Sequence, residues 1–115
     1  MLTSFLKSKL HPLTVTATDL HYDGSLTLDS ALMEKAGLRE FEKILAVDLN
    51  NGNRFETYII KGEKDSGKVC VNGAAARLAS IGDNLIIMSF ALLDSREIKD
   101  HKPVNIRVSS ENRPL

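Results

Sequence analysis

The apolar run Leu85–Leu92 constrains the fold of this chain more than any other segment. Ser89 is its one polar residue, so a strand built from the run would be apolar on both faces. Strands of this kind lie at the centre of a sheet, where both faces are covered. The run is far shorter than a membrane-spanning helix. We therefore expect it to form the central strand of a small closed barrel.

Turn signals divide much of the remaining chain into short extended segments. The β-branched stretch Leu13–Thr18 predicts a strand that runs toward Tyr22, and Ser25–Leu28 alternates as a return strand. The Asn-Gly pair within Asn50–Asn53 predicts a hairpin. The remaining expected strands are 44–49, 55–60, 69–71 and 103–108. Short strands punctuated by turns predict an all-β or β-dominated fold with only short helices.

Only two brief helices are expected. Asp29 is a good N-cap for a helix over Ala31–Ala36, and Gly37 is suited to end it. The buried stripe of this helix would be Leu32, Met33 and Ala36. Asn72 could cap a second short helical turn over residues 74–78.

Bulk properties exclude several classes of protein. The 115 residues include 15 basic and 15 acidic side chains, so the chain lacks the positive charge that binding to nucleic acid or anionic membranes requires. Cys70, the single cysteine, lies between two valines and is expected to be a buried hydrophobe in a reducing, cytoplasmic protein. The three histidines lack metal-ligand spacing, and we expect no metal. One domain is expected over 1–115, with a poorly ordered polar tail from residue 109.

The most informative candidate site is the Gly24–Ser25 bond, which follows Asp23. An Asp-Gly pair is most often a plain hairpin turn with positive φ angles. A Gly-Ser bond can also cleave itself. The serine hydroxyl attacks the preceding carbonyl, the resulting ester undergoes β-elimination, and hydrolysis leaves a pyruvoyl group on the new N-terminus. That chemistry needs a strained turn, which Gly24 would permit, and an oxyanion donor, for which Thr57 is a candidate.

Strand alternation places two further candidate site residues on one face of a strand. Arg54 and Tyr58 are four residues apart, so they would share one face of a strand with Glu56, while Thr57 lies on the other face. Arg offers a planar fork for a carboxylate, and Tyr offers a proton. The alternative is a solvated arginine and an amphipathic tyrosine at the rim of a sheet.

Two other segments could meet an anion. Lys9 and His11 share a face if their segment is extended, although a solvated charge cluster is the commoner outcome. Asn72–Ala76 would expose backbone N–H groups at a helix start with little side-chain cover, and its alternative is tight packing through small residues.

Taken together, these segments resemble pyruvoyl-dependent aspartate 1-decarboxylase, a family that makes β-alanine for pantothenate synthesis. The likeness runs in order through nearly the whole chain. The segments that carry it are Lys7–His11, Asp19–Ser25, Asn51–Arg54, Thr57–Tyr58, Asn72–Ala76 and Gly82–Asp83. The resemblance implies a double-psi β-barrel, a homotetramer with active sites between subunits, and self-cleavage into a β chain of residues 1–24 and an α chain of residues 25–115. An accessory maturation factor is a further partner compatible with the resemblance.

The resemblance also implies roles for matching residues. Ser25 would become the pyruvoyl group, which forms a Schiff base with L-aspartate and accepts electrons as CO₂ leaves. Thr57 would assist processing, Arg54 and Lys9 would bind the substrate carboxylate, and Tyr58 would be the proton donor. The residues expected to bind substrate are Lys9, Arg54, Thr57, Asn72, Gly73, Ala74 and Ala75, with His11 and Tyr22 near the site.

One position departs from the pattern that the resemblance leads us to expect. Pro12 stands where many relatives are expected to carry a basic residue, and this puts part of the substrate attraction in doubt. The competing class is a barrel without catalytic activity, either a scaffold or a swapped-hairpin transcription regulator. Zero net charge argues against the regulator. The chain as written, with Ser at position 25, is either the uncleaved precursor or the genetic sequence of a cleaved protein.

Overall fold

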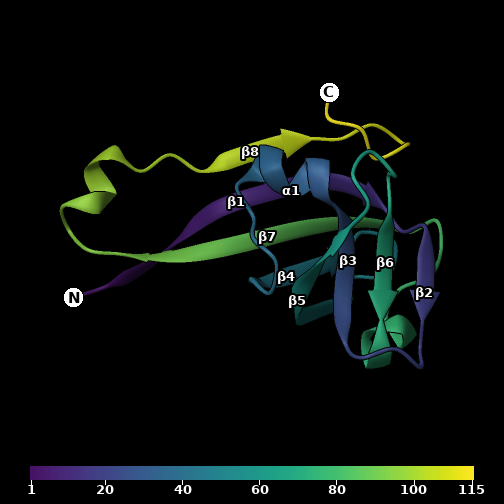
Figure 1. The fold of residues 1–115 in the computed structure, drawn as a ribbon. Coiled ribbons are helices and arrows are strands. Elements are labelled where there is room, and N and C mark those ends of the chain that lie inside the picture. Colours follow the sequence, from purple (N-terminus) through teal and green to yellow (C-terminus); the bar gives the residue numbers. More distant parts are fainter.

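The computed structural model describes all residues from 1 to 115 and is dominated by β-strands (Figure 1). Only α1 is an α-helix, and η1 and η2 are short 3₁₀ helices. The elements are β1 (Thr3–Thr14), β2 (Ala17–Asp19), β3 (Ser25–Asp29), α1 (Ser30–Ala36), β4 (Lys43–Asp48), β5 (Arg54–Gly62), β6 (Val69–Asn72), η1 (Gly73–Arg77), β7 (Asn84–Leu93), η2 (Glu97–Asp100) and β8 (Val104–Arg107). The expected all-β class is confirmed.

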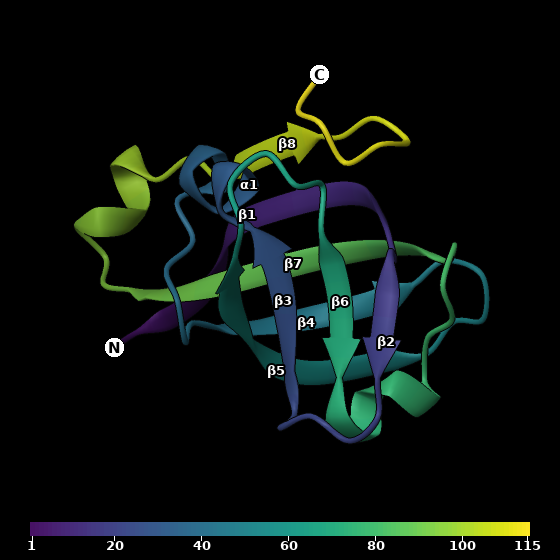
Figure 2. The same ribbon diagram turned by 45° about the vertical axis from the view of Figure 1, so that its right-hand side comes forward.

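The strands follow the order β2-β6-β3-β5-β4-β7-β1-β8. Figure 2 shows β3, β6 and β2 crossing in front of β7, β4 and β5, so the sheet forms two layers. The hydrophobic core includes fully buried leucines and isoleucines from both layers. β7 pairs with β4 on one side and β1 on the other, which confirms the apolar run as a central strand.

Local signals correctly predict two further elements. Asp29 caps α1 by accepting a 2.8 Å hydrogen bond from the Ala31 backbone N–H, and Gly37 ends the helix with a φ of 70°. Leu32, Met33 and Ala36 are buried as expected. β4 and β5 form the expected antiparallel hairpin.

The expected strand and hairpin around Gly24 are wrong. Instead of one strand over Leu13–Thr18, β1 ends at Thr14 and the chain turns before β2. β2 and β3 do not pair, because β6 lies between them and bonds to both. Gly24 is not among the residues with positive φ. The Asp-Gly pair therefore connects separated strands rather than turning a two-residue hairpin.

The C-terminal segment is ordered, contrary to the expectation of a loose tail. Asn112 is buried, and its side-chain oxygen accepts a 2.8 Å hydrogen bond from the Thr14 backbone N–H. Its amide group donates to the carbonyl oxygens of Thr14 and Gly67, each at 2.8 Å. These three bonds attach the tail to β1 and to the turn before β6. The polar composition misled the prediction because Asn112 meets backbone groups distant in sequence.

The outer face of β7 is apolar and uncovered in one chain. The inward residues Leu85 and Ile87 are fully buried, whereas Phe90 and Leu92 are 48% and 64% exposed. No helix of the structure is long and apolar enough to cross a membrane.

Two carboxyl groups meet where the β4–β5 hairpin contacts the turn before β7. Asp48 is fully buried, and its carboxyl group shares a hydrogen bond with Asp83. Burial is the main cause that raises the pKa of Asp48, and the hydrogen bond to Asp83 adds to it. The same hydrogen bond is the main cause that lowers the pKa of Asp83. Of the two carboxyl groups, Asp48 is therefore the one with the higher pKa.

Replacing Asp48 by asparagine should change how stability depends on pH. The folded-state pKa of Asp48 lies above its unfolded value, so its contribution to the free energy of unfolding decreases as pH rises through the folded pKa. Asp48→Asn removes that decrease. Urea unfolding at fixed protein concentration should therefore show the variant gaining stability relative to the native chain as pH rises above about 4. Asp100→Asn, at an exposed carboxylate, is the control, and a pH-independent difference for Asp48→Asn would contradict the prediction.

Candidate functional site

Ser25 and Asn72 face each other across the antiparallel pair of β3 and β6. Both side chains are buried, with 1% and 3% of their surface exposed. Asn72 Nδ2 donates a 3.0 Å hydrogen bond to Ser25 Oγ, which in turn donates to the Asp23 carbonyl oxygen at 3.2 Å. An N–H group aimed at a hydroxyl favours negative charge on that oxygen. The structure thus holds Ser25 where its hydroxyl is dry and polarised.

The expected capping role of Asn72 is wrong. Its backbone precedes η1, but its side chain makes no capping hydrogen bond. The amide instead bonds to Ser25 and, at 3.0 Å, to Thr27 Oγ1. The Asn72 side chain bonds across the strands rather than to the first turn of η1, because β3 brings two hydroxyl groups opposite the end of β6.

Gly73 allows η1 to approach the Gly24–Ser25 bond closely. Its φ is 72°, and a Cβ atom added there would lie 2.6 Å from Gly24 Cα and 3.1 Å from the Tyr22 carbonyl oxygen. A Cβ at Gly24 would meet nothing within 4 Å. From the sequence, Gly24 is the glycine expected to permit a strained turn. In the structure, the position where only glycine fits is instead Gly73.

A cavity of about 390 Å³ opens beside Asn72, which is one of its lining residues. Its walls include Tyr22 and Asn72 from the expected site, together with Thr27 and Cys70. The charged side chains of Lys61, Lys68, Asp19 and Glu63 also line it. The expectations from sequence missed Thr27 and Cys70, although alternation places them two residues from Ser25 and Asn72 on the same strands.

The expected residues of β5 lie on the strand next to β3. Phe55 and Ile59 are buried, whereas Arg54 and Tyr58 are exposed on the other face, as alternation predicts. Tyr58 packs its ring near Phe41, with ring centroids 6.5 Å apart. Parallel pairing of β3 and β5 begins with Leu26 and Ile59, so Ser25 and Tyr58 immediately precede the first pair.

Thr57 makes no side-chain hydrogen bond to Ser25 or Gly24 in this structure. It is half-buried and pairs with Ile44 in the β4–β5 hairpin. Ala74 and Ala75 lie in η1, directly after Gly73, with Ala74 exposed and Ala75 half-buried.

Lys9 and His11 lie on β1, separated from β3 in the sheet order by β5, β4 and β7. They share a face, because Leu10 between them is fully buried and both are half-buried. Burial is the main cause that lowers the pKa of His11, and the positive charges of Lys9 and Arg107 add to it. No ion pair of the structure neutralises Lys9 or Arg107. The chain therefore carries unpaired cationic side chains on β1 and β8, at the other end of the sheet order from β3.

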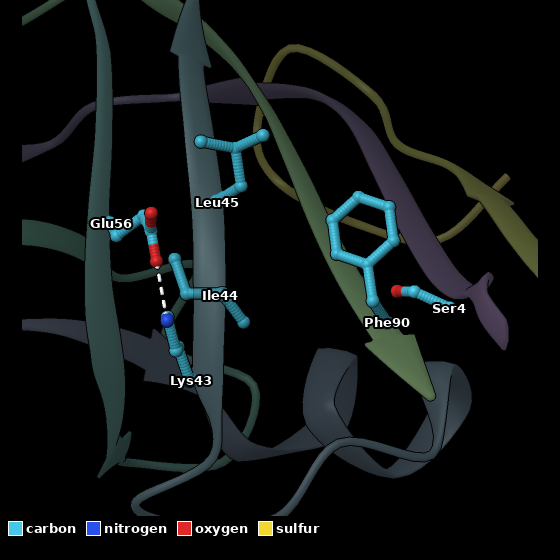
Figure 3. Close-up of a pocket in the computed structure, with 6 residues that line it drawn as sticks. All are labelled: Ser4, Lys43, Ile44, Leu45, Glu56 and Phe90. Atoms are coloured by element: carbon cyan, nitrogen blue, oxygen red, sulfur yellow. Dashed lines mark ion pairs between the residues drawn. The ribbon is translucent and has the colours of Figure 1, made fainter. Parts of the chain in front are cut away.

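A separate pocket of about 330 Å³ lies on the outer face of β4, β5 and β7 (Figure 3). An ion pair between Lys43 and Glu56, 2.6 Å long, crosses one side, and Phe90 stands on the other. None of the expected site residues lines this pocket. No cluster of three or more His, Cys, Asp or Glu side chains could hold a metal ion.

The Gly73 contact can be tested against a matched glycine. Gly52 has a similar φ of 78°, but a Cβ there meets nothing within 4 Å. Both alanine variants place a side chain at a similar positive φ, so Gly73→Ala should lose about 1–3 kcal/mol more unfolding free energy than Gly52→Ala because it overpacks Gly24. Urea unfolding measures both, and equal losses would show that the close approach costs nothing.

Comparisons with known proteins identify the family of this chain. The family model for aspartate decarboxylase matches residues 1–115. A protein of Caldicellulosiruptor bescii named aspartate 1-decarboxylase is 53% identical over 98% of this chain and 88% of its own length. Proteins of the same name from Lactiplantibacillus plantarum and Thermoanaerobacter pseudethanolicus are 52% and 48% identical, over 98% and 96% of this chain and over 87% and 94% of their own lengths. The chain belongs to the aspartate decarboxylase family.

Proposed function

We propose that this protein decarboxylates L-aspartate to β-alanine and CO₂, using a pyruvoyl group that it makes from its own Ser25. The observation that carries the proposal is the buried Ser25 hydroxyl, held by Asn72 beside the Gly24 peptide bond. Membership of the aspartate decarboxylase family supports the same reaction. β-Alanine produced in the cytoplasm would supply pantothenate synthesis.

The proposed processing converts one peptide bond into two chain ends. Ser25 Oγ attacks the Gly24 carbonyl carbon, the C–N bond breaks, and the hydroxyl proton moves to the Ser25 nitrogen, giving an ester. Loss of the Ser25 α-proton then expels the Gly24 carboxylate and leaves dehydroalanine. One water hydrolyses the tautomeric imine, and ammonia departs. The products are a chain of residues 1–24 and a chain of residues 25–115 that begins with the pyruvoyl group.

The chain's own groups suit these steps. The Asn72 N–H stabilises negative charge on Ser25 Oγ when the hydroxyl gives up its proton, because a hydrogen bond in a buried site is stronger than one in water. Gly73 keeps the residue 22–24 segment close to η1. Thr57 remains our candidate for a donor to the oxyanion formed at the Gly24 carbonyl.

A pyruvoyl group, once formed, supplies an electron-accepting carbonyl to which the amine of aspartate can be joined. We assign Arg54 and Lys9 to the carboxylates of the substrate, because both are cations without an ion-pair partner in the chain. Tyr58 would deliver the proton that replaces CO₂. Asn72, Ala74 and Ala75 would line the site, with His11 and Tyr22 near it.

A second subunit would bring the separated groups together. Three strands separate β3 in the sheet order from β1, which carries Lys9 and His11, and we propose a homotetramer whose active sites lie between subunits. The exposed Phe90 and Leu92 are suited to an interface, because one chain leaves them in contact with water. We further propose that the two crossed layers form a double-psi β-barrel, which fits the mixture of parallel and antiparallel pairs around β3 and β6.

Intact mass under denaturing conditions tests the proposed processing. The native protein should give two fragments that separate between residues 24 and 25, and the heavier one should carry a ketone in place of the Ser25 amine. Ser25→Ala should fold and remain a full-length, inactive chain, because alanine offers neither a nucleophile nor an oxygen leaving group. A native chain that stays intact would point to a barrel without catalytic activity, and cleavage of Ser25→Ala would contradict the mechanism.

Tyr58→Phe should separate processing from turnover. The substitution keeps the ring but removes the acid, and a positioned general acid contributes about 10²–10⁴-fold. Cleaved Tyr58→Phe enzyme should therefore form β-alanine about that much more slowly if protonation limits the rate, while Ser25 still converts. Near-native β-alanine production, with no loss of the pyruvoyl mass during turnover, would remove Tyr58 from this role.

A further inference from the structure

Four side chains form a square on one face of the β3–β6 pair: Ser25, Thr27, Cys70 and Asn72. Ser25 lies opposite Asn72, and Thr27 lies opposite Cys70. The residues between them on each strand belong to the hydrophobic core, so these four point to the other face. Cys70 is 6% exposed and has no assigned role in the reaction.

The hydrogen bonds within the square have defined directions. Asn72 Nδ2 donates to Ser25 Oγ and Thr27 Oγ1, each at 3.0 Å. The Cys70 thiol donates to Asn72 Oδ1, with 3.1 Å between sulfur and oxygen. All three hydrogen bonds of the Asn72 side-chain amide therefore join it to other members of the square.

The Asn72 side-chain amide could in principle be turned by 180°, which would exchange its oxygen and its NH₂ group. Of its three partners, the Cys70 thiol is the one that favours the observed orientation over the reversed one. The hydroxyl groups of Ser25 and Thr27 can each donate or accept, so they would tolerate a reversed Asn72. A reversed amide would direct its NH₂ group at Cys70 sulfur, which is a weak acceptor. Burial is the main cause that raises the pKa of Cys70, so the thiol keeps the hydrogen that it donates.

We propose that Cys70 is a positioning residue for self-cleavage, because its thiol holds the Asn72 amide so that an N–H group points at Ser25 Oγ. The N–H favours negative charge on Oγ when the hydroxyl gives up its proton, before that charge passes to the Gly24 carbonyl oxygen during the attack. A reversed amide would place an oxygen there and oppose the same charge. The inference rests on the proposed self-cleavage and names a residue that acts on it through Asn72.

The test compares rates of self-cleavage in variants of the full chain. Native protein, Cys70→Ala and Cys70→Ser are purified rapidly and incubated at one temperature, and the loss of full-length chain is followed by intact mass. Cys70→Ala lacks the donor and should cleave roughly 2- to 10-fold more slowly, the range expected for one neutral hydrogen bond. Cys70→Ser retains a donor and should restore a rate within about twofold of the native one.

Val71→Ala is the control for general loosening of β6. Val71 is fully buried on the opposite face and does not contact the Asn72 amide through a hydrogen bond. Urea unfolding identifies the stability loss of each variant, and Cys70→Val replaces Cys70→Ala if the latter does not fold. A native rate in the variant without a donor, an equal slowing by Val71→Ala, or no rescue by serine would each overturn the role of Cys70. Failure of the native chain to cleave would instead overturn the proposed processing, and the inference with it.

Discussion

The buried carboxylate of Asp29 connects more separate parts of this structure than any other side chain. It caps α1 through the Ala31 N–H, and it also accepts backbone hydrogen bonds from Asp65 and Gly67 at 2.9 and 2.8 Å. Arg113, in the C-terminal segment, lies 3.8 Å from it. Three N–H donors satisfy a charge that is 1% exposed, which is what allows a carboxylate to remain in such a place. The end of β3, the helix, the turn before β6 and the tail all meet there.

The position of Ser25 depends on this anchor because both residues belong to the five-residue strand β3. Asp29 fixes one end of the strand, and pairing with β5 and β6 on its two sides fixes its register. Ser25 at the other end then faces Asn72, with Gly73 pressed against Gly24. A serine in a mobile loop would lack a fixed donor, whereas this one has its hydroxyl oriented before any reaction begins.

Sequence patterns predict the parts of this fold that depend on neighbouring residues. Asp29 and Gly37 delimit α1, and the Asn-Gly turn closes the β4–β5 hairpin, because each signal acts within a few residues. The insertion of β6 between β2 and β3 is a non-local pairing that no turn signal reveals, and it makes the hairpin at Gly24 wrong. The site divides in the same way. Residue types and alternation nominate Ser25 and Tyr58 as candidates, whereas the side-chain contacts of Asn72 depend on register between strands distant in sequence.

Because β1 pairs with two other strands, self-cleavage would change how the molecule is held together and how it refolds. β1 is twelve residues long, and it pairs with β7 on one edge and with β8 on the other. A break after Gly24 would leave β1 and β2 on a short peptide whose strands are held entirely by non-covalent neighbours. That peptide would complete the sheet as an inserted strand, much as a separate subunit does. Refolding from denaturant would then become a bimolecular association whose rate depends on concentration, whereas the intact precursor would refold as one chain.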